Sequence, residues 1–121
     1  MAHILIADDA ATIRLLVKRH LQAAGHEVTE AVDGPAALEL GRSQGFDLAI
    51  LDQLMPGMKG IDVLHTWRSE QIDLPVILLS GVDDHHAVVD SLEEGAADYI
   101  RKPFSPSELN ARVGRVLATS G

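Results

Sequence analysis

Short apolar runs recur along the chain, each bounded by polar or turn-forming residues. The run Leu48–Leu51, which follows Asp47, is too short for a helix and contains no polar residue. Such a run is typical of a strand that is buried on both faces, as in a parallel sheet. The same pattern predicts strands over residues 3–7, 27–32, 47–51, 76–79 and 97–100.

Between these runs, apolar residues recur at helical spacing. In the segment 12–24 they fall on one face, and Gly25 is suited to end the helix. Pro35 stands where the first turn of the next helix tolerates proline. Near the C-terminus, Ser105 or Ser107 would cap the last helix. The pattern predicts helices over residues 12–24, 35–43, 61–71 and 84–94, and from one of these serines to residue 118.

Strands that alternate with helices through short loops predict an α/β fold, in which helices cover both faces of one parallel sheet. The chain of 121 residues contains no repeat, low-complexity tract or internal linker. A domain of this length can bury about two-thirds of its unfolded surface. We therefore expect a single doubly wound domain over residues 1–121, either a stand-alone protein or part of a longer one.

The composition narrows the classes of function. With 18 acidic and 10 basic residues, the net charge is -8, which disfavours direct binding to nucleic acid phosphates. The absence of cysteine excludes disulfides and thiolate metal sites. No apolar run approaches the ~20 residues of a membrane helix, and the first charged residue, Asp8, comes too early for a secretory signal. We expect a soluble, cytoplasmic domain that does not contact membranes.

Candidate chemistry lies at the ends of the predicted strands. Asp8 and Asp9 follow the first strand, Asp52 the third, Ser80 the fourth and Lys102 the fifth. Right-handed crossovers bring the carboxyl ends of parallel strands to one edge of the sheet. Neighbouring carboxylates are tolerable if a hard cation such as Mg²⁺ lies among them, and Mg²⁺ also accepts phosphate oxygens. With a lysine and a hydroxyl nearby, a carboxylate could carry a phosphoryl group. The alternative is that each residue only caps its own helix, which would place five independent caps of suitable types at the same edge by coincidence.

These residues, in this order and spacing, resemble the receiver (REC) domain of two-component response regulators over residues 3–118. The resemblance is carried by Asp8-Asp9, Asp52-Gln-Leu-Met-Pro-Gly-Met-Lys-Gly60, Ser80-Gly81 and Lys102-Pro103-Phe104, with Tyr99 three residues before the lysine. It implies a flavodoxin-like fold, with five parallel strands in the order 2-1-3-4-5 and five helices.

The resemblance also implies a function for the site. Asp52 would take a phosphoryl group from the phosphohistidine of a sensor histidine kinase or phosphotransfer protein, in a Mg²⁺-dependent reaction. Asp9 would bind Mg²⁺ directly and Asp8 through water. Asp52 and the backbone carbonyl of Leu54 would complete the ligands that the protein provides.

Phosphorylation would be converted into a signal by a switch of three residues, Ser80, Tyr99 and Lys102. A phosphoryl group adds close to two negative charges and several strong acceptors. Lys102 would pair with it, Ser80 would move to donate to it, and Tyr99 would turn into the space that Ser80 leaves. The switch would change the surface formed by the helix 84–94, the strand 97–100 and the last helix.

That surface would contact a downstream protein or effector domain, or form a homodimer on phosphorylation. Asp98, Glu108 and Arg112 would suit a dimer held by interleaved charges. The segment from Val82 to Ile100, however, contains neither lysine nor arginine. The sequence therefore leaves this mode of pairing open.

Two other functions remain to be weighed. A Mg²⁺-dependent phosphatase that forms an aspartyl phosphate usually has a second carboxylate two residues after the nucleophile. Here that position is Leu54, which cannot transfer protons, so we expect no enzyme beyond self-phosphorylation and slow self-dephosphorylation. A phosphorylation-independent interaction module of the same fold would require losses in the acidic set, and that set is complete.

Two apolar positions bear on how long the phosphoryl group persists. In the family that the chain resembles, the side chains two residues beyond the acceptor and two beyond the switch hydroxyl can orient the attacking water. Here these are Leu54 and Val82, and neither can form a hydrogen bond. Gly81 leaves the approach open without holding a water. The sequence therefore predicts slow loss of the phosphoryl group.

Overall fold

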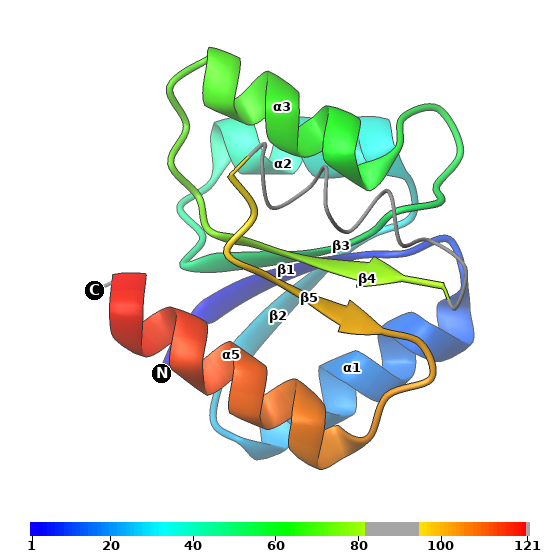
Figure 1. Ribbon diagram of the computed structural model, residues 1–121, viewed down its shortest axis with the longest axis vertical. Coiled ribbons are helices and arrows are strands. Elements are labelled where there is room, and N and C mark those ends of the chain that lie inside the picture. The colour runs from blue at the N-terminus through cyan, green and yellow to red at the C-terminus, as the bar shows by residue number, and fades with distance from the viewer. Residues whose placement is uncertain (82–94, 121) are drawn as a thin grey trace.

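The computed structural model describes residues 1–81 and 95–120, and its strands form one parallel sheet in the order β2-β1-β3-β4-β5. Figure 1 shows this sheet at the centre of the molecule, and its order confirms the expected topology. The strands are β1 (His3–Ala7), β2 (Glu27–Ala31), β3 (Leu48–Asp52), β4 (Val76–Ser80) and β5 (Asp98–Arg101).

Helices cover both faces of the sheet. On one face lie α2 (Gly34–Ser43) and α3 (Gly60–Ser69), and on the other α1 (Ala11–Ala23) and α5 (Pro106–Ser120) (Figure 1). These four are the helices of the described residues, and the fifth predicted helix, over 84–94, lies outside them. None of the helices in the described ranges is both long and apolar enough to cross a membrane.

Local chemistry sets two helix boundaries that the apolar pattern left open or misplaced. Ser105, and not Ser107, caps α5, because its Oγ accepts a hydrogen bond from the Glu108 backbone N–H at 3.1 Å. The third predicted helix ends at Ser69, two residues earlier than expected. Gln71 has a left-handed backbone with a φ of 62°, which a right-handed helix cannot include.

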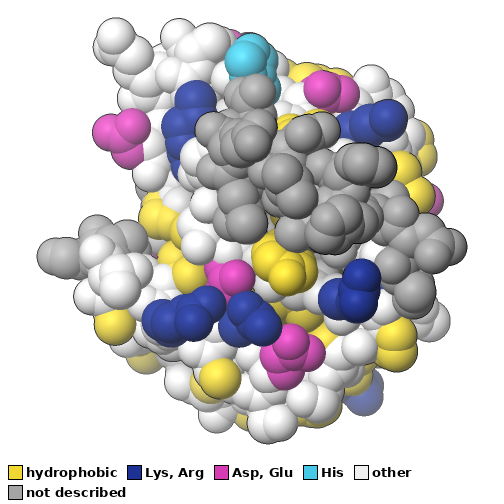
Figure 2. Space-filling view, viewed as in Figure 1, with side chains coloured by type: hydrophobic (Ala, Val, Ile, Leu, Met, Phe, Trp, Pro, Cys, Tyr) yellow, Lys and Arg dark blue, Asp and Glu magenta, His cyan; other side chains and the backbone are white. Residues whose placement is uncertain are grey.

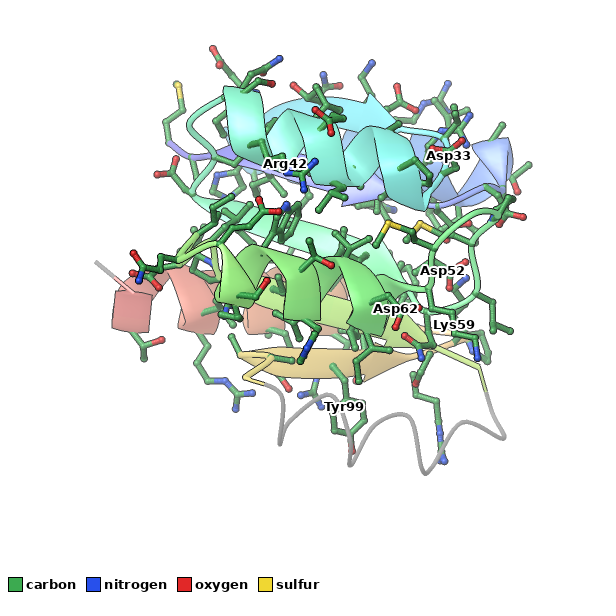
Figure 3. The ribbon with its side chains drawn as sticks, turned by 90° about the horizontal axis from the view of Figure 1, so that it is seen from above. Asp33, Arg42, Asp52, Lys59, Asp62 and Tyr99 are labelled. Carbon is green, nitrogen blue, oxygen red and sulfur yellow. The ribbon has the colours of Figure 1, made fainter. Side chains whose placement is uncertain are left out.

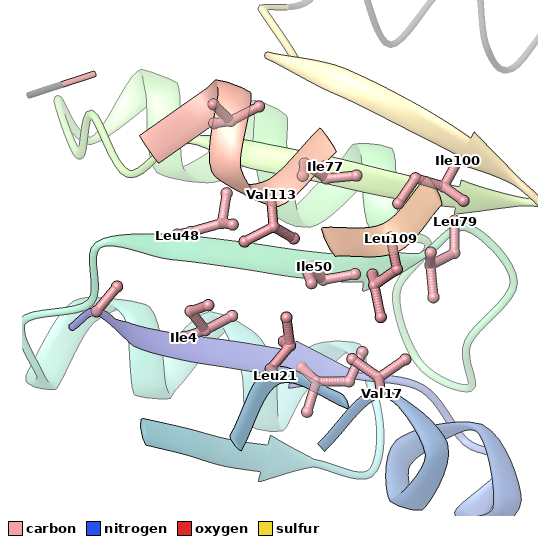
Figure 4. Close-up of a cluster of buried hydrophobic side chains, with 13 residues drawn as sticks. Ile4, Val17, Leu21, Leu48, Ile50, Ile77, Leu79, Ile100, Leu109 and Val113 are labelled. Atoms are coloured by element: carbon pink, nitrogen blue, oxygen red, sulfur yellow. The ribbon is translucent and has the colours of Figure 1, made fainter. Parts of the chain in front are cut away.

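The core consists of two apolar layers, one on each face of the sheet. Every residue of β3 and β4 is buried, which explains why their sequences are continuous apolar runs up to the polar residue that ends each strand. Alternate strand residues point to the α1 and α5 side, where they meet helix residues spaced by whole turns. Figure 4 shows that layer, which includes Ile4, Leu48, Ile50, Ile77, Leu79 and Ile100 with Val17, Leu21, Leu109 and Val113.

On the other face, a fully buried tryptophan joins the two helices. Trp67 of α3 is completely covered, and its Nε1 donates a hydrogen bond to the Leu38 carbonyl of α2 at 3.2 Å. Gly41 of α2 faces the indole ring so closely that an added Cβ would lie 2.7 Å from Nε1. The close approach of α2 and α3 therefore depends on the missing side chain of Gly41.

Gly41→Ala is expected to lower the free energy of unfolding by about 1–3 kcal/mol, because the methyl group overpacks the Trp67 ring. That cost outweighs the gain in helix propensity, which is at most about 1 kcal/mol. Gly114→Ala in α5 is the matched control, since nothing lies within 4 Å of its added Cβ. Urea denaturation should show the control at least as stable as wild type. A Gly41→Ala protein of equal or greater stability would refute the close contact.

Candidate functional site

The carboxyl ends of four neighbouring strands form the candidate site. Asp8 follows β1, Asp52 is the last residue of β3, Ser80 ends β4, and Lys102 follows β5. The backbone N–H of Lys102 donates to the Ser80 carbonyl at 2.7 Å, which joins the last two of these ends. In Figure 3, Asp52 lies at the end of the sheet beside the loop that carries Lys59. The predicted convergence of these residues at one edge is confirmed.

Three carboxylates meet at this edge. Asp8, Asp9 and Asp52 each offer an oxygen, and these oxygens lie within 4.8 Å of one another. Asp8 is fully buried and Asp52 is 6% exposed, whereas Asp9 is exposed to solvent. Carboxylate oxygens at this spacing could hold a hard divalent cation such as Mg²⁺. The donor set therefore fits the metal that the sequence predicts.

Lys102 joins the two buried carboxylates. Its Nζ lies 3.1 Å from Asp8 Oδ2 and 3.1 Å from Asp52 Oδ1. Buried charges persist only when they are paired in this way. Since one ammonium serves two buried carboxylates and Asp9 lies beside them, the site keeps an excess of negative charge.

The pKa shifts reflect that excess. Burial raises the pKa of the Asp52 carboxyl, and the charge of Asp8 raises it further. The charge and hydrogen bond of Lys102, and a hydrogen bond from the Leu54 backbone, counteract only part of this shift. Burial acts to lower the pKa of Lys102, but the carboxylates of Asp52 and Asp8 outweigh it and the net shift is upward. Lys102 is therefore a cation at neutral pH, and added positive charge would stabilise Asp52 in its ionised form.

The two oxygens of Asp8 already have partners. Its Oδ1 accepts a hydrogen bond from the Ala10 backbone N–H at 2.9 Å, and its Oδ2 accepts one from Lys102. Asp9 follows Asp8 directly and lies at the exposed side of the cluster. Which of the two carboxylates would contact a cation directly stays a prediction from the sequence.

Ser80 contributes a buried hydroxyl to this edge of the sheet. The residue is 2% exposed, and its Oγ has no hydrogen-bond partner within the described residues. A buried, unpaired hydroxyl costs about 1–3 kcal/mol. Such a group is available to a ligand that brings an acceptor to this edge of the sheet.

Tyr99, the other predicted switch residue, lies outside this cluster. It is half-buried on β5 and packs against the apolar layer on the α2 and α3 side. The guanidinium carbon of Arg112 lies 6.0 Å from the centre of its ring. Figure 3 shows Tyr99 well separated from Asp52 in that view. The structure therefore does not bring Tyr99 into contact with the acidic cluster, and its role in switching stays a prediction.

The charged residues expected at a dimer surface are paired within the chain. Asp98 is buried, with Arg112 Nη1 3.0 Å from its Oδ1 and Arg115 bound to its other oxygen. Glu108 contacts Arg112 at 3.2 Å. Figure 2 shows basic side chains beside acidic ones on the face that carries β5 and α5. A dimer held through these charges would have to exchange internal ion pairs for intermolecular ones.

Sequence reasoning overlooked Gln53, the residue after Asp52. Its side chain is buried, and its Oε1 accepts a hydrogen bond from the Ile61 backbone N–H at 3.0 Å. Its backbone carbonyl accepts one from Gly60 at 3.1 Å. Gln53 thereby closes the base of the loop between β3 and α3, which carries Leu54. A polar residue directly after an apolar run was the available signal, but such residues are common in turns.

Comparison with known sequences relates the chain to one family. The sequence profile of the response regulator receiver domain matches residues 4–114. The alkaline phosphatase synthesis transcriptional regulatory protein PhoP of Bacillus subtilis is 38% identical over 117 residues, which are 97% of this chain and 49% of that protein. The response regulator SaeR of Staphylococcus epidermidis is 38% identical over 118 residues, 98% of this chain and 51% of that protein. The chain thus spans about half the length of these relatives.

Solved structures agree with this relationship. The receiver domain of the Francisella response regulator 1452 is 34% identical, covers 100% of both chains and superposes with a TM-score of 0.94. A response regulator receiver domain protein from Clostridium thermocellum is 29% identical, with a TM-score of 0.91 over 98% of this chain and 96% of that one. Both similarities extend over the whole fold and not only over the site.

Proposed function

The chain belongs to the response regulator receiver domain family, and on that premise we propose that Asp52 is its phosphoacceptor in a two-component phosphorelay. The proposal rests on one observation. Asp52 lies at a sheet edge with two further carboxylates within 4.8 Å and with Lys102 Nζ 3.1 Å from its Oδ1. This is the donor set that a metal-assisted phosphoryl transfer to a carboxylate requires.

In the proposed reaction, a carboxylate oxygen of Asp52 attacks the phosphorus of a phosphohistidine on the kinase or phosphotransfer protein. The new O–P bond forms as the P–N bond breaks, and the electron pair of that bond leaves with the imidazole nitrogen. Lys102 pairs with the phosphoryl oxygens, and the Oγ of Ser80, which has no partner among residues 1–81 and 95–120, donates to one of them. Both contacts stabilise charge that the phosphoryl group brings to the site.

Mg²⁺ would be held by Asp9, Asp52 and the backbone carbonyl of Leu54, with Asp8 bound through water. When bound, Mg²⁺ supplies positive charge that offsets the phosphoryl oxygens. The raised pKa of Asp52 supports a cation at this edge, because the site by itself does not fully compensate its carboxylates. The Lys102 ammonium holds Asp52 in place before the donor arrives.

The contacts of Ser80 and Lys102 with the phosphoryl group also transmit the signal to the surface of the domain. When Ser80 and Lys102 engage the phosphoryl group, Tyr99 turns inward and the surface of β5 and α5 changes with it. A coupling of about 1–3 kcal/mol is enough for such a shift between two states. The helix expected over 84–94 would belong to this surface, but it lies outside the described residues.

Receiver domains are signalling domains, and Leu54 supports that role over a phosphatase in this chain. Turnover of external substrates needs a second proton-transferring group near the acceptor, and the side chain of Leu54 has none. A phosphorylation-independent module is disfavoured by the complete set of Asp8, Asp9, Asp52, Ser80 and Lys102. We propose that the domain works in the cytoplasm, alone or joined to an effector domain. Relatives of about twice its length are named as transcriptional regulators.

The proposal is tested by incubating the protein with acetyl phosphate and Mg²⁺. Intact-mass spectrometry should show the gain of one phosphoryl group per chain, and excess chelator should prevent it. Acetyl phosphate replaces the kinase, so no knowledge of the cognate partner is needed. A protein whose mass stays constant, or whose labelling is indifferent to chelator, would exclude a Mg²⁺-dependent acceptor.

Asp9→Asn is expected to weaken Mg²⁺ binding about a hundredfold and Asp8→Asn about tenfold. The first change removes a direct ligand, whereas the second removes a contact through water. Calorimetric titration of each variant with Mg²⁺ measures both constants. If Asp8→Asn proves the more damaging change, the assignment of direct and water-mediated ligands must be reversed.

A further inference from the structure

We propose that Arg14 is a positioning residue for the Mg²⁺ site, because it clamps the turn that carries Asp8 and Asp9 to the sheet. The inference rests on the proposed function, since it concerns the metal that the acceptor needs. Arg14 lies on α1 and would not touch the metal itself. It would act through the backbone of the turn between β1 and α1.

Arg14 contacts both the turn after β1 and the neighbouring strand β2. Its Nη1 donates a hydrogen bond to the Asp8 backbone carbonyl at 2.6 Å, and its Nε donates to Glu30 Oε1 at 3.2 Å. Although the residue is charged, its side chain is only 14% exposed. The planar guanidinium can hold two acceptors in a fixed relation, which a lysine ammonium cannot reproduce. Arg14 therefore fixes the position of the Asp8 carbonyl relative to Glu30.

The backbone of Glu30 is held in the sheet, although its side chain is 34% exposed. It belongs to β2, and its backbone is paired with Ile6 of β1 in the parallel ladder. Its second carboxylate oxygen lies 3.3 Å from Lys18 Nζ. The line of contacts thus runs from the sheet through Glu30 and Arg14 to the Asp8 carbonyl.

Arg14 acts together with other supports of the turn. The residue before α1 is Ala10, whose side chain cannot cap the helix. The turn is also held by the Asp8 backbone N–H, which donates to the Ala31 carbonyl at 3.3 Å, and by the Asp8 carboxylate, which accepts from the Ala10 backbone N–H and from Lys102 Nζ. Asp9 follows Asp8 directly, so the backbone of the turn sets the position from which its carboxylate extends. A shift of the Asp8 carbonyl would move Asp9 directly.

The two ways in which Arg14 could influence Mg²⁺ binding, through its charge or through the position of the turn, predict opposite changes in affinity when Arg14 is removed. Arg14 is a cation close to carboxylates that bind Mg²⁺, so its removal should strengthen Mg²⁺ binding through space. If Arg14 positions the ligands, its removal should weaken binding. The sign of the change separates the two explanations.

The experiment measures the Mg²⁺ dissociation constant of the folded protein by isothermal titration calorimetry. Arg14→Ala is expected to bind about tenfold more weakly than wild type, the size of effect seen when a supporting residue of a metal site is removed. Arg14→Lys keeps the charge but loses the two-way contact, so it should also bind more weakly. Lys18→Ala is the matched control. It removes a cation from the same Glu30 without touching the turn, and should stay within about twofold of wild type.

A kinetic measurement adds a readout that general destabilisation would not produce. With acetyl phosphate as donor, Arg14→Ala should need about tenfold more Mg²⁺ for half-maximal labelling of Asp52, with a near-normal rate at saturation.

Equal or tighter Mg²⁺ binding by Arg14→Ala and Arg14→Lys would overturn the inference. So would an equal loss in Lys18→Ala. If Arg14→Ala does not fold, Arg14→Lys decides the question. A wild-type protein that binds no Mg²⁺ would instead overturn the proposed function, and this inference with it.

Discussion

Asp52→Asn is expected to lose phosphorylation by acetyl phosphate, with a rate at least about a thousandfold below that of wild type, or about 4 kcal/mol in barrier. An amide nitrogen and oxygen cannot replace the carboxylate as a nucleophile. The substitution keeps the shape of the side chain, so the fold and the contact between Lys102 and Asp8 should persist. Intact-mass spectra over a time course measure the rate. Labelling of the variant at the wild-type rate would place the acceptor elsewhere.

The same substitution is expected to stabilise the metal-free protein. Because the folded environment raises the pKa of Asp52, its stabilising contribution is present below the ordinary carboxyl pKa and is lost as pH rises through the raised value. Asparagine is neutral at every pH. In chelator at neutral pH, Asp52→Asn should therefore melt a few degrees above wild type, and the difference should close as pH falls to about 4. A lower melting temperature for the variant at neutral pH would contradict the inference that the crowded carboxylates destabilise the metal-free protein.

Leu54→Asn is expected to shorten the lifetime of the phosphorylated protein about tenfold, which corresponds to ~1.4 kcal/mol in the barrier to hydrolysis. The Leu54 side chain is 60% exposed and stands two residues after the acceptor. Asparagine at that position can hold the attacking water in line with the Asp52–phosphorus bond, whereas leucine cannot. The decay of the phosphorylated species after removal of the donor measures the effect. Val82, the second apolar position, lies outside the described residues.

The variant Leu54→Ala distinguishes two ways in which residue 54 could affect hydrolysis, by orienting the attacking water or by blocking its access to the phosphorus. It removes most of the apolar side chain without adding a hydrogen-bonding group, so its decay should stay within about twofold of wild type. A Leu54→Ala protein that decays as fast as Leu54→Asn would show that the leucine slows hydrolysis by blocking water. A wild-type protein that decays within seconds would contradict slow self-dephosphorylation altogether.

The features that the sequence predicted well are those with strong local signals. β3 and β4 are buried on both faces, so their apolar runs had no competing interpretation. The edge strand β2 is weaker, since only Ala31 of its residues is fully buried. The prediction extended it to Val32, which is 56% exposed and lies beyond the end of the strand. Exposure on one side removes the pattern on which such boundaries depend.

The acidic edge was predictable because chain topology alone brings strand ends together. The supports of that edge were not predictable, because they depend on side chains that reach between elements. Arg14 reaches from α1 to Glu30, and Gln53 reaches from the end of β3 to α3. No spacing rule marks such pairs. Their only signals are a polar residue after an apolar run and a basic residue soon after the acidic pair.

Locating the modified residue shows whether Asp52 is the phosphoacceptor. Treating the phosphorylated protein with borohydride reduces an aspartyl phosphate to homoserine, which peptide mass spectrometry can assign to one position. We expect homoserine at position 52, and only when Mg²⁺ was present during labelling. Homoserine at position 8 or 9, or a phosphoryl group that resists borohydride because it resides on a histidine or serine, would contradict it.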